Sequence, residues 1–344
     1  MRPRRIGEFE LIQQIRNTTR LPQAVRSAVL TGIGDDAAVL KTRPGRVLLA
    51  TSDLLAESVH FDLAYTTYRQ LGYKAAMVNF SDIAAMGGTP RFVLVALALT
   101  ARQTPSHVTA FYAGIAAACR GAGAAAIVGG DTSASRTGLF LSLTVLGDAP
   151  PNTVLRRSTA RVGDHLYVTG TLGDAQAGLE ILQRRKKQSR PAKHGTDVIY
   201  LTTRHLMPTA RIAEGQLLAD RRLASAAMDL SDGLAGDIRH LCKESKVGCL
   251  LETQKLPLSR PLLAYAKATK RDPVAYALSG GEDYELLFTA PPANITSLES
   301  LIHRRVLRAT HIGHITPASR GLRLIGADGT IQPLIATGYE HRLR

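Results

Sequence analysis

Residues 68–99 read YRQLGYKAAMVNFSDIAAMGGTPRFVLVALAL, and this stretch decides the fold class. Its first part, 68–87, is rich in Ala and Met, and its apolar residues have helical periodicity. Gly87, Gly88 and Pro90 interrupt that helix. The segment that follows, 91–99, is rich in Val and Leu and predicts a strand. Since helix and strand patterns alternate along the first half of the chain, we expect an α/β architecture.

The rest of the chain gives patterns of the same kind. Strands are expected over 46–53, 124–131 and 139–148, and a helix over 107–123. Paired prolines mark a break at 148–154, after which strand–turn–helix patterns return. These later segments are 164–182, 224–245 and, as a turn followed by a strand, 277–290, while the basic stretch 183–198 predicts a solvated helix end and a loop. We therefore expect two domains, 1–150 and 151–344.

Composition narrows the class of protein. Of the 344 residues, 45% are hydrophobic, which excludes an intrinsically disordered chain. The longest apolar run, 92–99, is far shorter than the roughly 20 residues of a membrane-spanning helix, and no export signal is seen. Three cysteines without metal-site spacing predict a reduced, cytoplasmic setting. The net charge of +15 leaves nucleic acid, an anionic membrane surface and phosphorylated substrates open as partners.

Aspartate recurs at the ends of the apolar segments. Any one such residue is expected to be a turn or helix-cap residue, but their recurrence beside Gly, Ser and Thr points to a site. In α/β folds, the polar ends of strands line one crevice, where gathered carboxylates repel each other unless cations lie between them. Oxygen ligands without a His/Cys cluster suit Mg²⁺. The aspartates concerned are Asp35, Asp36, Asp53, Asp82, Asp131, Asp229 and Asp232.

The common phosphate-binding and catalytic motifs are missing from the sequence. There is no GxxxxGK[ST] loop, GxSxG elbow, HExxH motif or kinase catalytic loop. The segment GAGAAA at 121–126 only partly resembles GxGxxG, and it precedes a strand instead of following one. A nucleotide would therefore be held largely by metal ions and scattered basic residues.

Ten ordered blocks of sequence extend over nearly the whole chain: GEFELI (7–12), GIGDDAAVL (32–40), TSDLLAESVHF (51–61), NFSDIAAMGGTP (79–90), GGDT (129–132), RRSTARVGD (156–164), YVTGTLGD (167–174), DLSDGL (229–234), SGGEDYELLF (279–288) and GYEH (338–341). Together they resemble the thiamine-monophosphate kinase family, within the superfamily of aminoimidazole ribonucleotide synthetase. The block at 279–288 and the tail at 338–341 are the most particular to this family.

The resemblance implies a reaction and its participants. The family transfers the γ-phosphoryl group of ATP to thiamine monophosphate, giving ADP and thiamine diphosphate in the last step of thiamine diphosphate biosynthesis. It uses several Mg²⁺ ions. Because a phosphate monoester is already largely anionic at pH 7, no residue is needed as a general base. Transfer then depends on bringing two polyanions together, which cations and a guanidinium such as Arg157 favour.

The resemblance also implies which residues form the site. The implied metal ligands are Asp36, Thr51, Ser52, Asp53, Asp82, Asp131, Asp229 and Asp232, with Asp35 as a neighbour or a turn residue. The implied ATP contacts are Gly130, Asp131, Arg157 and Ser231, with Tyr112 either a nucleotide contact or a packing aromatic. The implied thiamine-phosphate contacts are His60, Glu282 and Tyr339.

Simpler interpretations of these residues remain open. Glu282 is followed by Asp283 and Glu285, so it could lie in a solvated acidic turn. Otherwise, a carboxylate at Glu282 and an aromatic ring at Tyr339 suit the cationic thiazolium of the substrate. His60 could donate a hydrogen bond to the acceptor phosphate.

The implied architecture is a two-domain α/β (α+β) fold like that of aminoimidazole ribonucleotide synthetase. The first domain binds ATP and metal, and its strands join those of a second copy in a homodimeric β-barrel. The second domain closes the active-site cleft.

Two alternative functions stay in view. One is a sister ATP-dependent enzyme, such as selenophosphate or aminoimidazole ribonucleotide synthetase; the former needs a reactive Cys near the N-terminus, and the first Cys here is Cys119. The other is a basic nucleic-acid-binding protein, although no aromatic–basic interleaving supports it.

Overall fold

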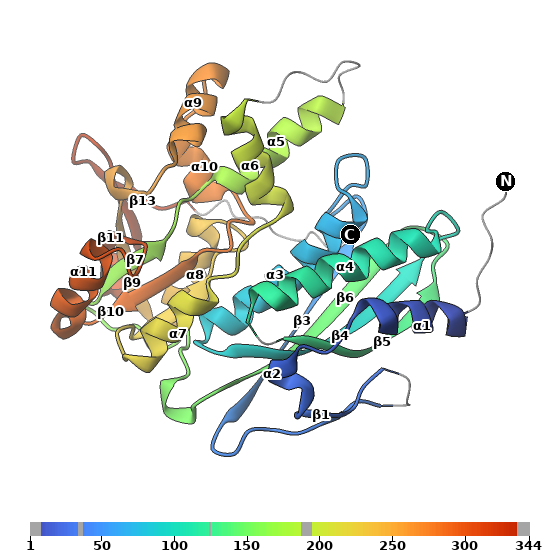
Figure 1. Ribbon diagram of the computed structural model, residues 1–344. Coiled ribbons are helices and arrows are strands. Elements are labelled where there is room, and N and C mark those ends of the chain that lie inside the picture. Colours follow the sequence, from blue (N-terminus) through green and yellow to red (C-terminus); the bar gives the residue numbers. More distant parts are fainter. Residues whose placement is uncertain (1–7, 34–36, 124, 187–194, 336–344) are drawn as a thin grey trace. The chain divides into compact units, whose positions relative to one another are not determined.

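The structure is a computed structural model that describes residues 8–33, 37–123, 125–186 and 195–335 (Figure 1). The described chain divides into two compact units. Unit 1 comprises residues up to 83 together with 88–152, and unit 2 comprises 84–87 together with residues from 153 onward. Within the described ranges, no helix combines the length and apolar character needed to cross a membrane.

Unit 1 is built on an open four-stranded sheet in the order β3-β6-β4-β5. Strands β4 and β5 run parallel, whereas β6 is antiparallel to both β3 and β4. The parallel pair is joined by a helix, as a parallel connection requires. The elements are β3 (Val47–Ala56), α3 (Tyr68–Ala85), β4 (Thr89–Leu99), α4 (Pro105–Gly121), β5 (Ala126–Ala134) and β6 (Phe140–Ala149).

Smaller elements precede this sheet in the chain. The two-stranded sheet β1-β2 is antiparallel, and α2 packs beside it through Val25 and Ala28. These elements form an apolar cluster with Phe92 of β4 and Val128 of β5. Their bounds are α1 (Glu8–Thr18), α2 (Gln23–Arg26), β1 (Val29–Thr31) and β2 (Val39–Leu40).

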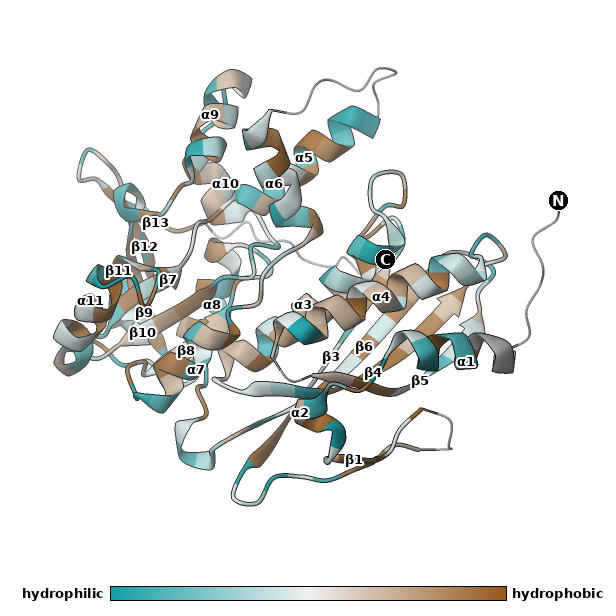
Figure 2. Cartoon of the chain, viewed as in Figure 1, coloured by the Kyte–Doolittle hydropathy of each residue, from teal (hydrophilic) through white to brown (hydrophobic). Residues whose placement is uncertain are grey.

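The core of unit 1 lies where the sheet meets its long helices. Helix α3 buries one apolar residue after another, and the middle strands β4 and β6 do the same. Strand β4 is accordingly mostly brown in Figure 2. The fully buried side chains here include Leu71, Phe80, Ile83, Val93, Val95, Ile115, Leu141 and Leu143.

Helix α4 begins two residues earlier than the sequence pattern indicates. Thr104 caps the helix by accepting a hydrogen bond from the His107 amide, and the His107 ring accepts one from the Thr104 amide. Pro105 occupies the first turn, where it needs no hydrogen-bond donor. This capping box uses a histidine in place of the usual Glu or Gln, which hides it from a motif search.

Unit 2 is built on a seven-stranded sheet in the order β13-β12-β9-β11-β7-β10-β8. Its strand pairs are antiparallel except for β12 and β9. The strands are β7 (His165–Thr169), β8 (Ala226–Asp229), β9 (Val247–Glu252), β10 (Leu286–Ala290), β11 (Ala309–Pro317), β12 (Leu322–Ile325) and β13 (Ile331–Pro333).

Helices cover both faces of this sheet. One apolar cluster joins α8 and α10 to Leu166, Ile312 and other strand residues, and another joins α7 and α11 to Tyr167 and Phe288. The helices are α5 (Asp174–Lys186), α6 (Thr196–Leu206), α7 (Ile212–Asp220), α8 (Leu234–Ser245), α9 (Arg260–Thr269), α10 (Pro273–Ser279) and α11 (Ile295–His303). Short 3-10 turns occur at Pro151–Thr153, Thr253–Lys255, Pro292–Asn294 and Ala318–Arg320.

The two units confirm the predicted mixed α/β, two-domain class and most of the predicted segments. The expected strands at 46–53, 91–99, 124–131 and 139–148 correspond to β3, β4, β5 and β6. The segment 277–290 begins with the last turn of α10, where the sequence predicts a turn. Of the basic stretch, α5 continues to Lys186, α6 starts at Thr196, and residues 187–194 lie outside the described residues.

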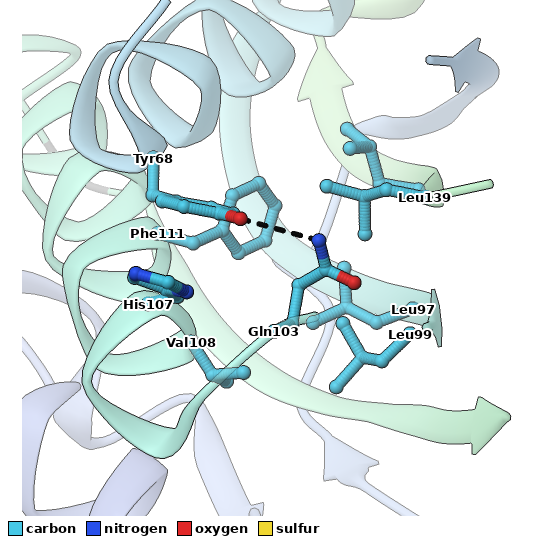
Figure 3. Close-up of a pocket in the computed structure, with 9 residues that line it drawn as sticks. Tyr68, Leu97, Leu99, Gln103, His107, Val108, Phe111 and Leu139 are labelled. Carbon is cyan, nitrogen blue, oxygen red and sulfur yellow. Dashed lines mark hydrogen bonds between the residues drawn. The ribbon is translucent and has the colours of Figure 1, made fainter. Parts of the chain in front are cut away.

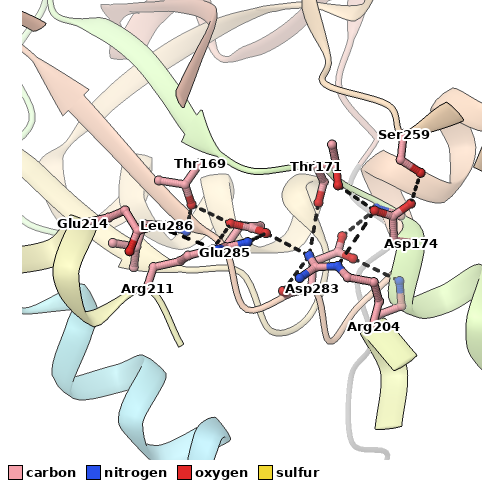
Figure 4. A network of polar contacts seen from close by, with 12 residues as sticks. Thr169, Thr171, Asp174, Arg204, Arg211, Glu214, Ser259, Asp283, Glu285 and Leu286 are labelled. Carbon is pink, nitrogen blue, oxygen red and sulfur yellow. Dashed lines mark hydrogen bonds and ion pairs between the residues drawn. The ribbon is translucent and has the colours of Figure 1, made fainter. Parts of the chain in front are cut away.

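A network of buried charges anchors the start of β10 in unit 2 (Figure 4). Glu285 is fully buried and accepts hydrogen bonds from Thr169 Oγ1 at 2.7 Å, Arg211 Nε at 2.6 Å and Arg204 Nη2 at 2.8 Å. Burial alone would raise the pKa of Glu285, but the Arg211 and Arg204 guanidinium groups hold it below its ordinary value. Glu285 is therefore a buried anion between two cations.

The neighbouring acids of this network are buried as well. Asp283 is 3% exposed and accepts hydrogen bonds from the amides of Gly173 and Ala175, at 2.6 and 3.2 Å. Burial raises the pKa of Asp283 to about 7, although Arg204 acts in the opposite direction. Asp174, also fully buried, accepts a hydrogen bond from Thr171 Oγ1 at 2.6 Å. The reading of 282–285 as a solvated acidic turn is therefore wrong.

We predict that Glu285→Gln lowers the free energy of unfolding by about 3–5 kcal/mol, because it leaves two buried guanidinium groups without their counter-charge. Urea denaturation followed by circular dichroism measures this change. The matched control is Lys255→Gln, which breaks the exposed Lys255–Glu252 pair and is expected to cost less than about 1 kcal/mol. Equal effects of the two substitutions would contradict the role assigned to Glu285.

Candidate active site

The predicted metal ligands of unit 1 that lie closest together come from β3 and α3. Side chains alternate along a strand, so Thr51 and Asp53 share the face of β3 opposite to that of Ser52. Thr51 Oγ1 donates a hydrogen bond to Asp82 Oδ2 of α3 at 2.5 Å. The strand and the helix thus bring Thr51, Asp53 and Asp82 to one place, as the resemblance implies.

The electrostatics of this place favour a bound cation. Asp53 Oδ2 is buried and accepts no hydrogen bond from any described residue. Burial, and secondly the charge of Asp82, raise the pKa of Asp53 to about 6. A divalent cation would supply the missing partner of Asp53 and remove the repulsion between the two carboxylates. The residues present therefore fit a hard, oxygen-ligated ion such as Mg²⁺.

The hydroxyl of Ser52 lies elsewhere. It is exposed on the other face of β3, and its Oγ lies 3.0 Å from Thr144 Oγ1 of the paired strand β6. The Ser52 hydroxyl therefore does not lie with Thr51, Asp53 and Asp82.

Asp131 and Gly130 lie on β5, at the opposite edge of the sheet from Asp53. The pairing registers align Asp53 with Leu143, Leu143 with Val95, and Val95 with Gly130. Three strand spacings of about 4.8 Å place Asp53 and Gly130 about 14 Å apart across the sheet. The sheet thus does not bring Asp131 beside Asp53 of the same chain.

Gly130 also has a structural reason to be glycine. Its φ of +155° is rare for other residues, and a Cβ added there would lie 1.9 Å from the main-chain oxygen of Val95. Glycine in the GGDT block is thus required by the pairing of β4 with β5, independently of any nucleotide.

His60 follows β3 in a turn and has a defined ring orientation. Its Nδ1 accepts a hydrogen bond from the Ala56 amide at 3.0 Å, and its own amide donates to the Ala56 oxygen at 3.0 Å. Because Nδ1 is the acceptor, the neutral ring carries its proton on Nε2. A donor at Nε2 is the form that a phosphate contact requires.

Tyr112 is a core residue of unit 1. It lies on α4, is 3% exposed and packs edge-on against the Phe111 ring. Burial raises the pKa of Tyr112, so its hydroxyl is neutral. Of the two roles that the sequence allows for Tyr112, a nucleotide contact or a packing aromatic, this placement fits the packing aromatic.

Unit 2 gathers a second set of carboxylates around the end of β8. Asp229 is the last residue of β8, and Ser231 and Asp232 follow in the turn before α8. Asp237, in the first turn of α8, accepts a hydrogen bond from the Asp232 amide at 3.1 Å. Burial, and then the charges of Asp229 and Asp232, raise the pKa of Asp237 to about 8.

Asp237 is a candidate that the sequence reasoning missed. An acidic residue in the first turn of a helix is common, because it interacts favourably with the helix dipole, so its spacing gave no signal. Its burial beside Asp229 and Asp232 is visible only in the fold.

The loop before β10 lies against this turn. The Glu282 amide donates to the Ser231 oxygen at 2.8 Å, and the Tyr284 amide donates to the Leu230 oxygen at 2.9 Å. Glu282 and Tyr284 have positive φ values, +68° and +50°, which cost energy and are often found at functional sites. Two separate blocks, DLSDGL and SGGEDYELLF, thereby place a predicted substrate residue next to a predicted ATP residue.

The side chain of Glu282 contacts a buried histidine of α6. Its Oε2 lies 2.9 Å from Nδ1 of His205, a residue of α6 that is 3% exposed. His205 was not predicted, since nothing in the sequence links it to residue 282. Glu282 itself is about one quarter exposed, so it remains accessible to a ligand.

Arg157 is exposed in the segment before β7, where its main-chain oxygen accepts a hydrogen bond from Ser245 Oγ at 2.8 Å. Asp35, Asp36 and Tyr339 lie outside the described residues.

An apolar pocket is found at the start of α4, in unit 1 (Figure 3). Tyr68 stacks on His107 with ring centroids 4.3 Å apart, and Gln103 Nε2 donates to the Tyr68 hydroxyl at 3.2 Å. Leucines of β4 and β6 complete the lining. None of the predicted site residues that the structure describes lines this pocket, so it is no part of the candidate active site.

Comparison with known proteins identifies the family. The N-terminal and C-terminal domains of AIR synthase related protein match residues 34–149 and 161–324. Thiamine-monophosphate kinase of Salmonella typhimurium is 39% identical over 97% of this chain and 98% of its own length. The enzyme of Aquifex aeolicus is 40% identical, over 85% of this chain and 88% of its own.

Solved structures agree. Thiamine-monophosphate kinase from Stenotrophomonas maltophilia K279a superimposes with a TM-score of 0.81 and 36% identity, over 94% of this chain and 97% of that one. A structure described as AaThiL complexed with AMPPCP and TMP gives 0.76 and 35%, over 99% and 100%. Because relatives of this identity match nearly its whole length and both domain models match as well, the chain belongs to the thiamine-monophosphate kinase family.

Proposed function

We propose that this protein transfers the γ-phosphoryl group of ATP to thiamine monophosphate with the help of Mg²⁺, giving thiamine diphosphate and ADP. The observation that carries the proposal is the pair Asp53 and Asp82, held together on β3 and α3 with one buried carboxylate oxygen lacking a hydrogen-bond donor among the described residues. The related structure that contains AMPPCP, an ATP analogue, and TMP supports the same two substrates.

The proposed ligands divide between the two units. Thr51, Asp53 and Asp82 would hold Mg²⁺ in unit 1, together with the Ser52 main-chain oxygen and Asp36, and Asp229 and Asp232 would do so in unit 2. When bound, the ions neutralise phosphate charge and orient phosphate oxygens. Asp237, which contacts the Asp232 amide, is proposed to position that turn.

The protein's own residues then bind and orient the two substrates. The acceptor phosphate needs no general base, because it is already largely ionised at pH 7. His60 would donate from Nε2 to this phosphate, since its Nδ1 is occupied by the Ala56 amide. Glu282 and Tyr339 would bind the cationic thiazolium, and Gly130, Ser231 and Arg157 would contact ATP.

We further propose a cytoplasmic homodimer in which two copies of the unit 1 sheet close a barrel. Strand β3 is an edge of the sheet, and its outer face exposes Leu48 and Leu54, each nearly 60% accessible. An open sheet edge that is flanked by exposed apolar side chains is normally covered by a partner. If β3 pairs with β5 of a second copy, Asp131 of the partner subunit comes to the edge that carries Asp53, which the sheet of one protomer cannot achieve.

Direct assay tests the function. Incubated with Mg²⁺, ATP and thiamine monophosphate, the protein is expected to form thiamine diphosphate and ADP in equal amounts, measured by chromatography. Unphosphorylated thiamine is the control acceptor and should give no product. Absence of thiamine diphosphate, or tight DNA binding at low ionic strength without any kinase activity, would favour the alternatives instead.

For the metal site, we predict that Asp82→Asn lowers kcat by about 100-fold or more, because a charge that offsets phosphate repulsion is lost with its cation. The amide oxygen of Asn can still accept the Thr51 hydrogen bond, so the melting temperature should change little. Asp220→Asn, which alters an exposed carboxylate at the end of α7, is the control and should leave kcat unchanged. Near-normal turnover of Asp82→Asn would exclude Asp82 as a ligand.

For the substrate site, we predict that Glu282→Gln raises the KM for thiamine monophosphate about tenfold, equivalent to roughly 1.4 kcal/mol, because the thiazolium loses its counter-charge. The KM for ATP should stay within about twofold, on the same scale. Steady-state kinetics with each substrate varied in turn gives both constants, and Glu244→Gln on the exposed side of α8 is the control. A parallel rise of the two KM values would place Glu282 outside the thiamine-phosphate subsite.

A further inference from the structure

Three histidines of unit 2 lie together on one face of its sheet, at the opposite end of the strands from Asp229. His165 is on β7, and His311 and His314 are on the neighbouring strand β11. Each offers a ring nitrogen, and these nitrogens all lie within 4.8 Å of one another. The ring centroids of the three pairs are 4.6 to 5.0 Å apart.

A β-bulge is what brings His311 and His314 to the same side. Residues three apart on a regular strand point to opposite faces. Here the pairing of β11 with β7 shifts between His311 and Gly313, so that Ile312 is the extra residue and His314 lies directly opposite His165. Gly313 permits the bulge, since a Cβ at this position would lie 2.0 Å from the Leu250 oxygen.

The histidines have the properties of ligands. His311 Nε2 is buried and accepts or donates no hydrogen bond among the described residues. Burial, and secondly His314, lower the pKa of His311 to about 4, and burial and His165 lower that of His314. Neutral imidazole, the form that binds metal, is therefore the resting state of both rings. All three residues are only half-buried, so an ion can reach them from solvent.

The surroundings are mixed in charge. Glu252 of β9 places Oε1 4.0 Å from His314 Nε2, and Lys255 lies 2.8 Å from the same carboxylate. The buried Tyr167 ring lies 5.2 Å from the His311 ring, measured between ring centroids. The carboxylate can orient a bound histidine or serve as a further ligand, whereas Lys255 competes with the cation for it.

We propose that His165, His311 and His314 form a binding site for one divalent transition-metal ion of the Zn²⁺ type, which links β7 to β11. Imidazole favours such ions over Mg²⁺. Nitrogens bound at 2.0–2.1 Å in a tetrahedral site lie about 3.3 Å apart, so small side-chain rotations from the present arrangement complete it. Water or Glu252 would take the fourth position. The site uses no residue of the proposed kinase reaction and stands independently of it.

The test is calorimetric titration of the full chain with Zn²⁺ in excess Mg²⁺, which keeps the carboxylate sites filled. We expect one equivalent of Zn²⁺ to bind to the unaltered chain and this equivalent to be lost in His311→Asn and in His314→Asn. His240→Asn, on the exposed face of α8, is the matched control and should retain it. Binding that is absent from the unaltered chain, or equal in all variants, would overturn the proposal.

A second measurement avoids dependence on the variants' folding. Diethyl pyrocarbonate modifies accessible histidines, and mass spectrometry locates the modified rings. In the unaltered chain, added Zn²⁺ should protect His165, His311 and His314 while leaving His240 reactive. Equal modification of the three with and without Zn²⁺ would overturn the site whatever the variants show.

Discussion

The fully buried carboxylate of Glu285, shared by the guanidinium groups of Arg204 and Arg211, is the interaction on which unit 2 most depends. Glu285 directly precedes β10, a strand that lies between β7 and β8 in the sheet. A charge at this depth is tolerated only with its partners in place, so the network fixes where the preceding loop runs. That loop carries Glu282 and contacts the turn of Ser231 and Asp232. The position of Glu282 thus depends on buried charges that belong to the structural network around Glu285.

Local patterns account for what the sequence predicted well. The helix at 68–87 and the strand at 91–99 follow from apolar periodicity and from the glycines and proline between them. The expectation that Asp53 and Asp82 share one site came from the family resemblance. No local pattern relates a strand residue to a helix residue 29 positions later in the chain. Asp237, His205 and the histidine trio were missed for a physical reason: each depends on burial or pairing between distant segments. The bulge at Ile312 in particular reverses the face on which simple alternation would place His314.

The net charge of +15 also has a clearer meaning. Some of the 43 Lys and Arg residues lie inside the units, where arginines neutralise buried acids. Arg204 and Arg211 do so in unit 2, and Arg46 and the largely buried Arg91 surround Asp148 in unit 1. Arginine suits this role because its planar fork makes several hydrogen bonds and stays charged when desolvated. These residues are structural, and they do not form a surface for nucleic acid.

Strand β3 carries two unrelated tasks on its two faces. The side chains of Thr51 and Asp53 lie on the face of β3 toward α3. Those of Leu48, Ser52 and Leu54 lie on the opposite face. Because the alternation has a period of two, inserting or deleting one residue in β3 would exchange the faces, turning carboxylate outward and leucine inward. A substitution leaves this division between the two faces intact. A one-residue insertion preserves it only if a β-bulge absorbs the extra residue, as the bulge at Ile312 does in β11.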